Sequence, residues 1–431
     1  MNSCLLSEKQ ANKNVNYLAG LDFIISLGFG LIMPLFPQYV VLLGGGGLEV
    51  GILFSSFVLT RALLATPFGN LSDRIGRKKI ILIGSFLYAV LAVLFTVPES
   101  WIGLTLVRGL QGVASAMVWP VSEALVIDSC PADRRGASLG KVVMSANLGM
   151  VFGPFIGGAL YFSGSELLGM SDVQSFKFPF YFTALVALVG AALVWINVTD
   201  ARIPAKDKRK ITLGKLLHPD GMTRQGLRNL RVLYANAAME GFSFSSIGPL
   251  MALFLMFEFL LDPDVVSVVL GSAMGVGALI AFPSGRLADR WSKKVLFVIG
   301  GYIAFVGTIL LPFSWTLAAA IAFLAMRAMA FQVASPALRA LQADTVPEEV
   351  RGRLIGMLES MSNAGSVLGA PIGGLLWDAF YDKDVGTFIE IDGTIMPFLV
   401  SGLLGLFTVT LVLLLVKEQA RGPARAEGQG K

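Results

Sequence analysis

The chain has 431 residues, of which 55% are hydrophobic and only 15% are charged, and its mean hydropathy is +0.72. Soluble globular proteins carry about a quarter charged residues, so this deficit indicates a protein whose solvent is lipid. Two cysteines and a single histidine, His218, exclude a disulfide framework, a four-ligand zinc site of Cys and His, and a His-based catalytic triad. No nucleotide-binding glycine loop is present either. We therefore expect no metal, no cofactor and no enzymatic activity.

In chain order, the sequence contains apolar stretches of roughly 18–28 residues, each able to cross about 30 Å of hydrocarbon as a helix. We place twelve of them near residues 17–43, 50–71, 79–97, 101–129, 138–161, 178–198, 231–258, 265–287, 294–312, 316–340, 354–378 and 393–417. The polar start of the chain lacks the pattern of a cleaved secretory signal. The predicted fold class is an all-α integral membrane protein with twelve transmembrane helices. Its predicted parts are a tail at 1–16, a six-helix bundle at 17–198, a linker at 199–229, a second six-helix bundle at 230–417 and a tail at 418–431.

Lysine and arginine are concentrated in alternate loops. One set of loops contains Arg74, Arg77, Lys78, Lys79, Arg134, Arg135, Lys141, Arg202, Lys206, Lys208, Arg209, Lys210, Lys215, Arg290, Lys293, Lys294, Arg351 and Arg353, whereas the other contains only Lys177 and Lys383. The positive-inside rule places the basic loops and both termini in the cytoplasm, and so predicts a multi-pass protein of the cell (inner) membrane. The net charge of +5 is then a topology signal and does not indicate a nucleic-acid partner.

An internal repeat links the two halves of the chain at an offset of 216 residues. Gly69, Asp73 and Arg74 recur as Gly285, Asp289 and Arg290; Pro120, Asp128, Pro131, Arg135 and Gly136 recur as Pro336, Asp344, Pro347, Arg351 and Gly352; Gly149, Gly153, Gly157 and Gly158 recur as Gly365, Gly369, Gly373 and Gly374. One register kept over so many residues predicts two six-helix halves related about an axis along the membrane normal. A central site between the halves is expected.

The segment from Gly69 through Asp73, Arg74 and Arg77 to Lys79 resembles the signature loop between helices 2 and 3 of the major facilitator superfamily. Its second copy, which contains Asp289 and Arg290, has Ser292 where Gly76 stands in the first copy. The resemblance implies that Asp73, Arg77 and Asp128 form a cytoplasmic gating cluster that steadies the outward-facing state and separates in an inward-open state. The alternative is a plain basic loop that only sets topology.

Three further segments support the resemblance. The fifth span contains Gly149, Gly153, Pro154, Gly157 and Gly158, similar to a motif associated with drug/proton antiporters of the superfamily. Small residues at four-residue spacing also serve general close helix packing, so that interpretation stays open. The fourth span contains Arg108 and Gln111 in a pattern similar to the family's fourth-helix arginine motif, which is linked there to proton coupling. The first span is similar to that of twelve-span drug exporters, including tetracycline antiporters.

Ionisable residues inside the spans predict the site independently. Each costs about 2.5–3.5 kcal/mol in a bilayer unless it is paired or hydrated. Together with Gln111, the candidate substrate and proton cavity residues are Asp22, Arg61, Arg108, Glu123, Glu240, Arg327 and Glu359. The superfamily fold implies that helices 1, 4, 7 and 10 lie at the centre, and each of them contains at least one of these residues. Structural ion pairs between helices, for instance Asp22 with Arg61, are the alternative.

The resulting hypothesis is a monomeric secondary active transporter that exports amphipathic small molecules in exchange for protons, with Asp22, Glu123, Glu240 and Glu359 as candidate proton carriers. Its expected partners are a small-molecule substrate, protons and the lipid bilayer, and the proton motive force is its expected energy source. Two alternatives stay open. One is a carrier of the same family for a sugar, organic ion, peptide or lysolipid. The other is a receptor that binds a ligand without moving it.

Overall fold

The structure is a computed structural model that describes residues 6–201, 222–346, 351–381 and 393–417; the side chains of residues 281–283, 285–290, 351 and 353 are not described. Every regular element in these ranges is helical, which confirms the predicted all-α class. The first half comprises α1 (Glu8–Ile32), α2 (Phe36–Leu42), α3 (Gly47–Ile75), α4 (Arg77–Leu94), α5 (Trp101–Ser129), α6 (Arg135–Phe162), η1 (Ser163–Leu167), α7 (Asp172–Ser175) and α8 (Lys177–Asn197).

The second half comprises α10 (Arg224–Ile247), α11 (Leu250–Phe259), α12 (Pro263–Arg290), α13 (Lys293–Leu310), η2 (Leu311–Phe313), α14 (Leu317–Thr345), α15 (Arg351–Phe380), η3 (Gly393–Ile395) and α16 (Met396–Leu415). Each of the twelve predicted spans corresponds to one long helix, with α2 and α11 as continuations of α1 and α10. Both continuations follow a proline, Pro34 or Pro249, which cannot donate the next helical hydrogen bond.

Ten helices within the described residues are long and apolar enough to cross a membrane. Of the two remaining long helices, α4 begins with the basic residues Arg77, Lys78 and Lys79, and glycine, serine and asparagine lower the hydropathy of α15. Both nevertheless pack among the apolar helices, since α4 contacts α5 and α8, and α15 contacts α10 and α3.

Two helices begin inside segments that were predicted as a tail and a linker. Helix α1 begins at Glu8, inside the segment predicted as a tail, because the Ser7 side chain accepts a hydrogen bond from the backbone N–H of Gln10 and caps the helix. Helix α10 begins at Arg224, inside the predicted linker, where Thr223 caps it through the N–H of Gly226. Most of the predicted linker and the predicted tail at 418–431 lie outside the described residues.

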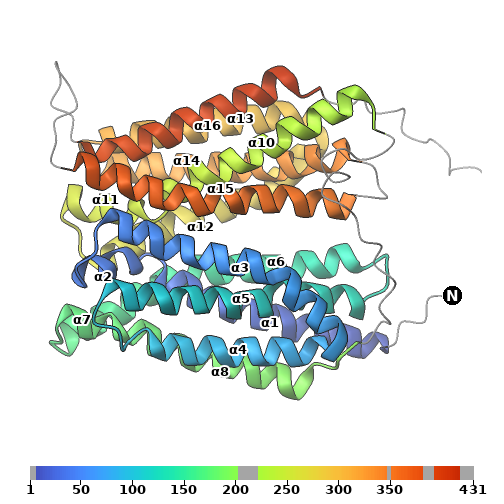
Figure 1. Ribbon diagram of the computed structural model, residues 1–431, viewed down its shortest axis with the longest axis horizontal. Coiled ribbons are helices and arrows are strands. Elements are labelled where there is room, and N and C mark those ends of the chain that lie inside the picture. The colour runs from blue at the N-terminus through green and yellow to red at the C-terminus, as the bar shows by residue number, and fades with distance from the viewer. Residues whose placement is uncertain (1–5, 202–221, 347–350, 382–392, 418–431) are drawn as a thin grey trace, which may run out of the picture.

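The helices form two stacked halves with the same internal packing (Figure 1). In the first half α1 contacts α6 and α8, α5 contacts α3 and α4, and α4 contacts α8. The second half repeats these contacts as α10 with α15 and α16, α14 with α12 and α13, and α13 with α16. This correspondence follows the 216-residue offset, so the sequence repeat is a repeat of structure.

Two seams join the halves, one between α3 and α15 and the other between α6 and α12. We call the side of the molecule where α1 begins and α4, α6 and α13 start with Lys or Arg the basic face, and the other side the opposite face. One hydrophobic cluster spans both halves, and its second-half members lie in the helix segments toward the opposite face, such as Val266, Leu324 and Trp377. A separate cluster fills the second half toward the basic face, around Leu233, Leu341 and Val412.

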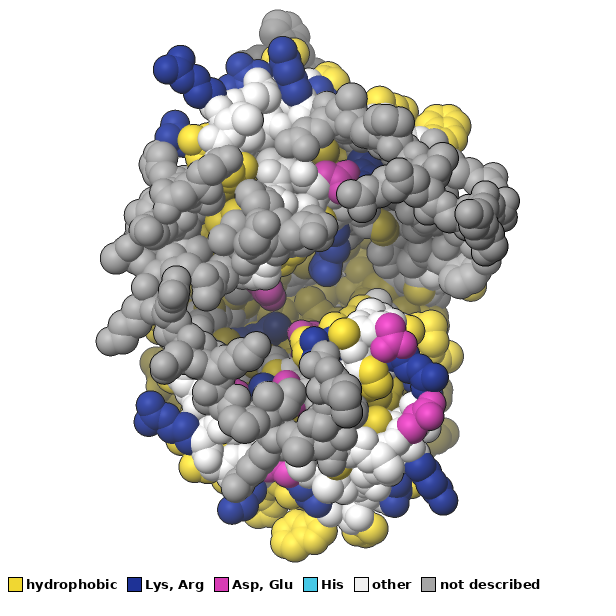
Figure 2. Space-filling view, turned by 90° about the vertical axis from the view of Figure 1, so that its right-hand side faces the viewer, with side chains coloured by type: hydrophobic (Ala, Val, Ile, Leu, Met, Phe, Trp, Pro, Cys, Tyr) yellow, Lys and Arg dark blue, Asp and Glu magenta, His cyan; other side chains and the backbone are white. Residues whose placement is uncertain are grey.

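The halves therefore share a core toward the opposite face and separate toward the basic face. Figure 2 looks onto the basic face and shows a hollow between the two halves, with hydrophobic side chains at its floor and basic and acidic side chains along it. We call this hollow the cleft. It lies between the two halves, where a central site was predicted.

Candidate functional site

Asp22 lies near the middle of α1 and is only 4% exposed. Its Oδ2 accepts a hydrogen bond of 3.2 Å from the Ser122 hydroxyl of α5, while Oδ1 has no hydrogen-bond partner among the described residues. None of the ion pairs between described side chains includes Asp22, so the alternative of a structural pair with Arg61 is not formed here. A buried carboxylate without a cation is unfavourable when charged, which makes Asp22 suited to carrying a proton.

Arg108 is completely buried on α5 and is surrounded by aromatic rings. Its guanidinium carbon lies 4.5–5.5 Å from the ring centroids of Phe29, Phe36, Phe54 and Phe57, and an Nη donates to Oε1 of Gln111. The negative faces of the rings partly replace a counter-ion, since cation–π attraction strengthens when the cation is desolvated. Arg108 and Gln111 thus belong to the packed interior of the first half and do not face the cleft.

Four charged side chains line the cleft from the two halves. Glu123 of α5 and Glu359 of α15 are exposed, Arg61 of α3 is partly exposed, and Arg61 interacts electrostatically with both carboxylates. Arg339 of α14 is exposed and interacts electrostatically with Glu123 across the cleft. No direct ion pair joins any two of these four side chains in the described part of the chain. The Arg61 guanidinium instead lies 4.6 Å from the centroid of a Trp119 ring.

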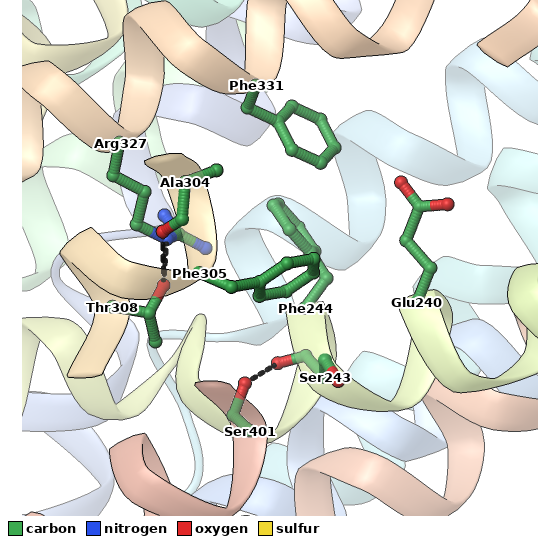
Figure 3. Close-up of a pocket in the computed structure, with 9 residues that line it drawn as sticks. All are labelled: Glu240, Ser243, Phe244, Ala304, Phe305, Thr308, Arg327, Phe331 and Ser401. Carbon is green, nitrogen blue, oxygen red and sulfur yellow. Dashed lines mark hydrogen bonds between the residues drawn. The ribbon is translucent and has the colours of Figure 1, made fainter. Parts of the chain in front are cut away.

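A small pocket in the second half brings Glu240 and Arg327 to opposite ends of an aromatic group (Figure 3). Phe244, Phe305 and Phe331 lie between the carboxylate and the guanidinium, and the ring centroids of Phe244 and Phe331 are 5.9 Å apart. The pocket volume of about 10 Å³ holds about one water molecule.

Polar partners inside the second half hold both charged groups of this pocket. Asn236 donates to Oε2 of Glu240 over 3.3 Å, and Nε of Arg327 donates to the Thr308 hydroxyl over 3.0 Å. The two charged groups are therefore kept apart by the aromatic rings instead of neutralising each other.

The three side chains of the predicted gating cluster lie next to one another. Arg77 Nε lies 2.5 Å from Oδ2 of Asp128, and its Nη2 lies 3.2 Å from Oδ1 of Asp73. In the second half Lys293 Nζ lies 2.5 Å from Oδ2 of Asp344, and both residues are the offset-216 equivalents of Arg77 and Asp128. Arg74 is exposed, and Gly69 has open space around it. The side chains at Gly285, Asp289 and Arg290 lie outside the described residues.

The three residues of this cluster lie together while the cleft is open toward the basic face. The reason is topological, because Asp73, Arg77 and Asp128 belong to α3, α4 and α5 of one half. Movement of one half against the other does not part them.

The glycine motif of α6 allows close approach of backbones. A Cβ atom at Gly153 would lie 2.6 Å from the carbonyl carbon of Gly30 in α1, and Gly149 and Gly157 are equally close to the α1 backbone. A Cβ at Gly158 would lie 2.9 Å from the Asp264 carbonyl oxygen across the seam to α12, and Pro154 packs against Gly271 of that helix. The motif therefore acts in packing within and between halves.

Sequence reasoning missed two polar groups near these features. Arg339 was left out because it lies in the last turns of α14, but it stands at the offset-216 position of Glu123, and this signal would have found it. Asp200 accepts hydrogen bonds from the N–H groups of Arg77 and Lys78 over 3.2 and 3.5 Å, and so caps α4. Asp200 lies just after the sixth span, and nothing in that position indicates that its side chain caps a helix more than 100 residues earlier in the chain.

Two six-helix halves around a charged cleft define the class of this protein as a membrane carrier. The sequence model of the Major Facilitator Superfamily matches residues 18–239 and again residues 233–431. The chain belongs to this superfamily and is a multi-pass membrane protein.

Relatives and solved structures agree with this assignment. The chain is 28% identical over 374 residues to an uncharacterized MFS-type transporter of Methanocaldococcus jannaschii, covering 85% of this chain and 92% of the relative. It is 25% identical over 382 residues to the quinolone resistance protein NorA of Staphylococcus aureus, covering 87% and 92%. A bacterial homolog of the human lysosomal transporter Spinster, solved in an inward-facing and occupied conformation, superposes with a TM-score of 0.81 at 16% identity, covering 97% of this chain and 100% of that one.

Proposed function

We propose that this carrier works by alternating access and exports amphipathic small molecules in exchange for protons. The observation that supports the proposal best is the charge arrangement along the cleft. The carboxylates of Glu123 and Glu359 lie there with Arg61 and Arg339, and no direct ion pair joins any of these groups in the described residues. Such groups are available to exchange protons or to meet a charged substrate.

Asp22 is the first candidate for the proton carrier. It lies in the interior beside Ser122, away from arginine ion pairs, and its neutral form is the one that burial favours. Glu240 is the second candidate, since it lines the aromatic pocket of the second half. A proton bound to either carboxylate on one side of the membrane and released on the other would couple the pH gradient to substrate movement.

The direction of transport is proposed from the relatives and from the distribution of basic residues. The similarity to a quinolone resistance protein over most of both chains favours export of aromatic, amphipathic compounds. The positive-inside rule places the basic face in the cytoplasm, so the cleft would open to the inside in this structure. Because the cleft is complete within one chain, a monomer would suffice for transport.

Transport by purified protein in proteoliposomes tests the proposal. The chain is reconstituted with norfloxacin, a fluorescent fluoroquinolone, and a pH gradient is imposed across the vesicle membrane. We expect norfloxacin to accumulate against its concentration gradient in the compartment from which protons leave. Collapse of the gradient with a protonophore should abolish accumulation while leaving downhill exchange intact.

The comparison with empty liposomes and with a counterflow assay separates the alternatives. Accumulation that is insensitive to the pH gradient would contradict proton coupling. Binding of norfloxacin without any movement across the membrane would favour a receptor over a carrier. Uptake in the same direction as the protons would favour a symporter.

A further inference from the structure

The seam between α3 and α15 is closed toward the opposite face by a stripe of small residues. Gly47, Gly51 and Ser55 recur at four-residue spacing on α3 and so face one direction. A Cβ atom at Gly47 would lie 2.9 Å from the Gly374 carbonyl oxygen of α15, and the Ser55 hydroxyl donates to the Val367 carbonyl over 2.6 Å. The two helices are therefore in backbone contact over about two turns.

Asp378 closes the end of this seam with two hydrogen bonds between the halves. Its Oδ1 accepts from the N–H of Gly47 and its Oδ2 from the N–H of Leu48, each over 2.7 Å. The first N–H groups of a helix have no partner inside the helix, and its N-terminus is electropositive. The carboxylate of one half therefore caps a helix of the other half with charge-assisted bonds, which are stronger than neutral ones.

Two neighbours adapt this end of α3 to the cap. Glu49 accepts from the N–H of Gly46 over 2.7 Å, and Gly46 is the neighbouring donor that Asp378 does not bind. A Cβ atom at Gly46 would lie 3.0 Å from Oδ1 of Asp378, and one at Gly47 would lie equally close. The glycines therefore let the carboxylate reach the backbone.

The second seam, between α6 and α12, has no such group among the side chains that the structure describes. Gly158 packs against the backbone of Asp264 there, and the Ser267 hydroxyl donates to Pro263 of its own helix. The offset-216 counterpart of Asp378 is Phe162, which cannot accept a hydrogen bond. Among the hydrogen bonds of the described residues, a carboxylate cap between the halves occurs only in the seam of α3 and α15.

We propose that Asp378 is a lock that holds the opposite face closed and sets the balance between the two states of the carrier. This inference rests on the proposed alternating access, because the seam must part for the cleft to open toward the opposite face. Both bonds break in that movement, and the two N–H groups and the Asp378 carboxylate, which is already exposed, bond to water instead. Weakening the lock then shifts the population toward the state that is open on the opposite face.

Distance measurements between spin labels on the two halves test the lock in nanodiscs. In a chain with Cys4→Ser and Cys130→Ser, labels at Val97→Cys and Trp315→Cys report the opposite face, where these residues are 64% and 96% exposed. Labels at Ala132→Cys and Trp291→Cys report the basic face. Asp378→Asn should shift the ratio of the two states by about three- to tenfold, widening the opposite face and narrowing the basic face.

A second variant removes the same bond from the other partner. Leu48→Pro deletes one N–H donor in the first turn of α3, where proline is tolerated, and leaves Asp378 in place. It should shift the ratio in the same direction, and it provides the measurement if Asp378→Asn does not fold. Glu99→Gln is the matched control, because it removes an exposed charge on the opposite face away from either seam.

The outcomes separate the lock from the underlying transport cycle. Two populations in the unaltered chain that do not change in either variant would overturn the lock alone. A single fixed distance on both faces, with no change on adding norfloxacin or on changing the pH of the solution, would overturn alternating access and the lock with it. A shift that Glu99→Gln reproduces would mean that surface charge, not the cap, sets the balance, and would also overturn the lock.

Discussion

Glu123 and Arg339 occupy equivalent positions of the two repeats, 216 residues apart, and interact electrostatically across the cleft with opposite charges. Residues related by the axis between two halves approach each other when the halves close around that axis. The two side chains are exposed and not in direct contact while the cleft is open toward the basic face. Closure of this face would bring them together.

Neutralising either residue should therefore slow transport. Glu123→Gln and Arg339→Gln are each expected to lower the initial rate several-fold, because the closed basic face loses an ion pair that is desolvated on closure. The double variant should be no slower than the slower single variant, since the pair is already lost in each. Initial rates in proteoliposomes, normalised to the amount of reconstituted protein, give this comparison.

Glu166→Gln combined with Arg224→Gln provides the control, because both residues are exposed at helix ends, in η1 and at the first position of α10. This variant makes the same change of charge and should transport at the normal rate. Additive effects of Glu123→Gln and Arg339→Gln would mean that the two residues act separately and do not pair.

The gating cluster should show a graded response. Asp128→Asn is expected to lower transport more than Asp73→Asn, because Arg77 lies 2.5 Å from Asp128 and 3.2 Å from Asp73. Both variants should reach the membrane at normal levels, since partly exposed ion pairs contribute about 0–1 kcal/mol to stability. Transport rate and expression level in the same membranes measure the two effects separately.

Asp133→Asn is the matched control for the cluster, because Asp133 is exposed in the loop that follows α5. Asp344→Asn should have a weaker effect than Asp128→Asn, since the Asp344 side chain is 50% exposed. Unchanged transport in both Asp73→Asn and Asp128→Asn would leave these residues with a role in topology alone.

Close packing of α6 on α1 predicts a strong position dependence for glycine substitutions. Gly153→Ala places a methyl group 2.6 Å from the α1 backbone, which cannot rotate away, and should destabilise the protein by about 1–3 kcal/mol. Gly140 lies on the same helix with open space around it. Gly140→Ala should therefore stabilise slightly, by up to about 1 kcal/mol, through helix propensity.

Thermal unfolding in detergent compares the two variants directly. Gly369→Ala, the equivalent change in the second half, should behave like Gly153→Ala. Equal melting temperatures for Gly140→Ala and Gly153→Ala would contradict close packing as the role of the motif.

The helices could be predicted because the length of each apolar stretch sets a span. The repeat could be predicted because residues such as Asp128 and Asp344 keep one offset of 216 in both halves. The predicted span at 101–129 coincides with α5, whose start is capped by Ser100 and whose end precedes Pro131. In contrast, Asp378 and its partner Gly47 are 331 residues apart in sequence, and no local pattern connects a carboxylate to a distant helix start.

Asparagine clamps at the helix ends were missed for the same reason. Asn14 donates to the Thr199 carbonyl over 2.8 Å and accepts from the Thr199 N–H over 3.0 Å, and so ties α1 to the end of α8. Asn229 makes the corresponding two bonds with Lys417, over 2.8 and 3.2 Å. Each asparagine lies in a polar helix start that the hydropathy pattern assigned to a tail or a linker.

Asp22 is the sharpest test of proton coupling. Asp22→Asn keeps the size and an acceptor for the Ser122 hydroxyl but removes the ability to ionise. The protein should fold at normal yield, because none of the arginines whose side chains the structure describes pairs with Asp22, so none of them is left with an unpaired buried charge. Norfloxacin exchange without a gradient should survive, while accumulation driven by a pH gradient should fall to the level of empty liposomes.

Exchange and gradient-driven accumulation are measured on the same purified preparation of Asp22→Asn. The same two assays are then run on a preparation of Glu240→Gln. Loss of driven accumulation with exchange retained in Asp22→Asn assigns proton transfer to Asp22, because substrate binding and the conformational cycle are then intact. Loss of both activities together with a lower folded yield would mean that Asp22 has a structural role. That result would contradict the proposal, which rests on Asp22 having only the Ser122 hydroxyl as a hydrogen-bond donor among the described residues. Driven transport at the normal level would exclude Asp22, and the same split between the two assays in Glu240→Gln would then place the proton in the aromatic pocket of the second half.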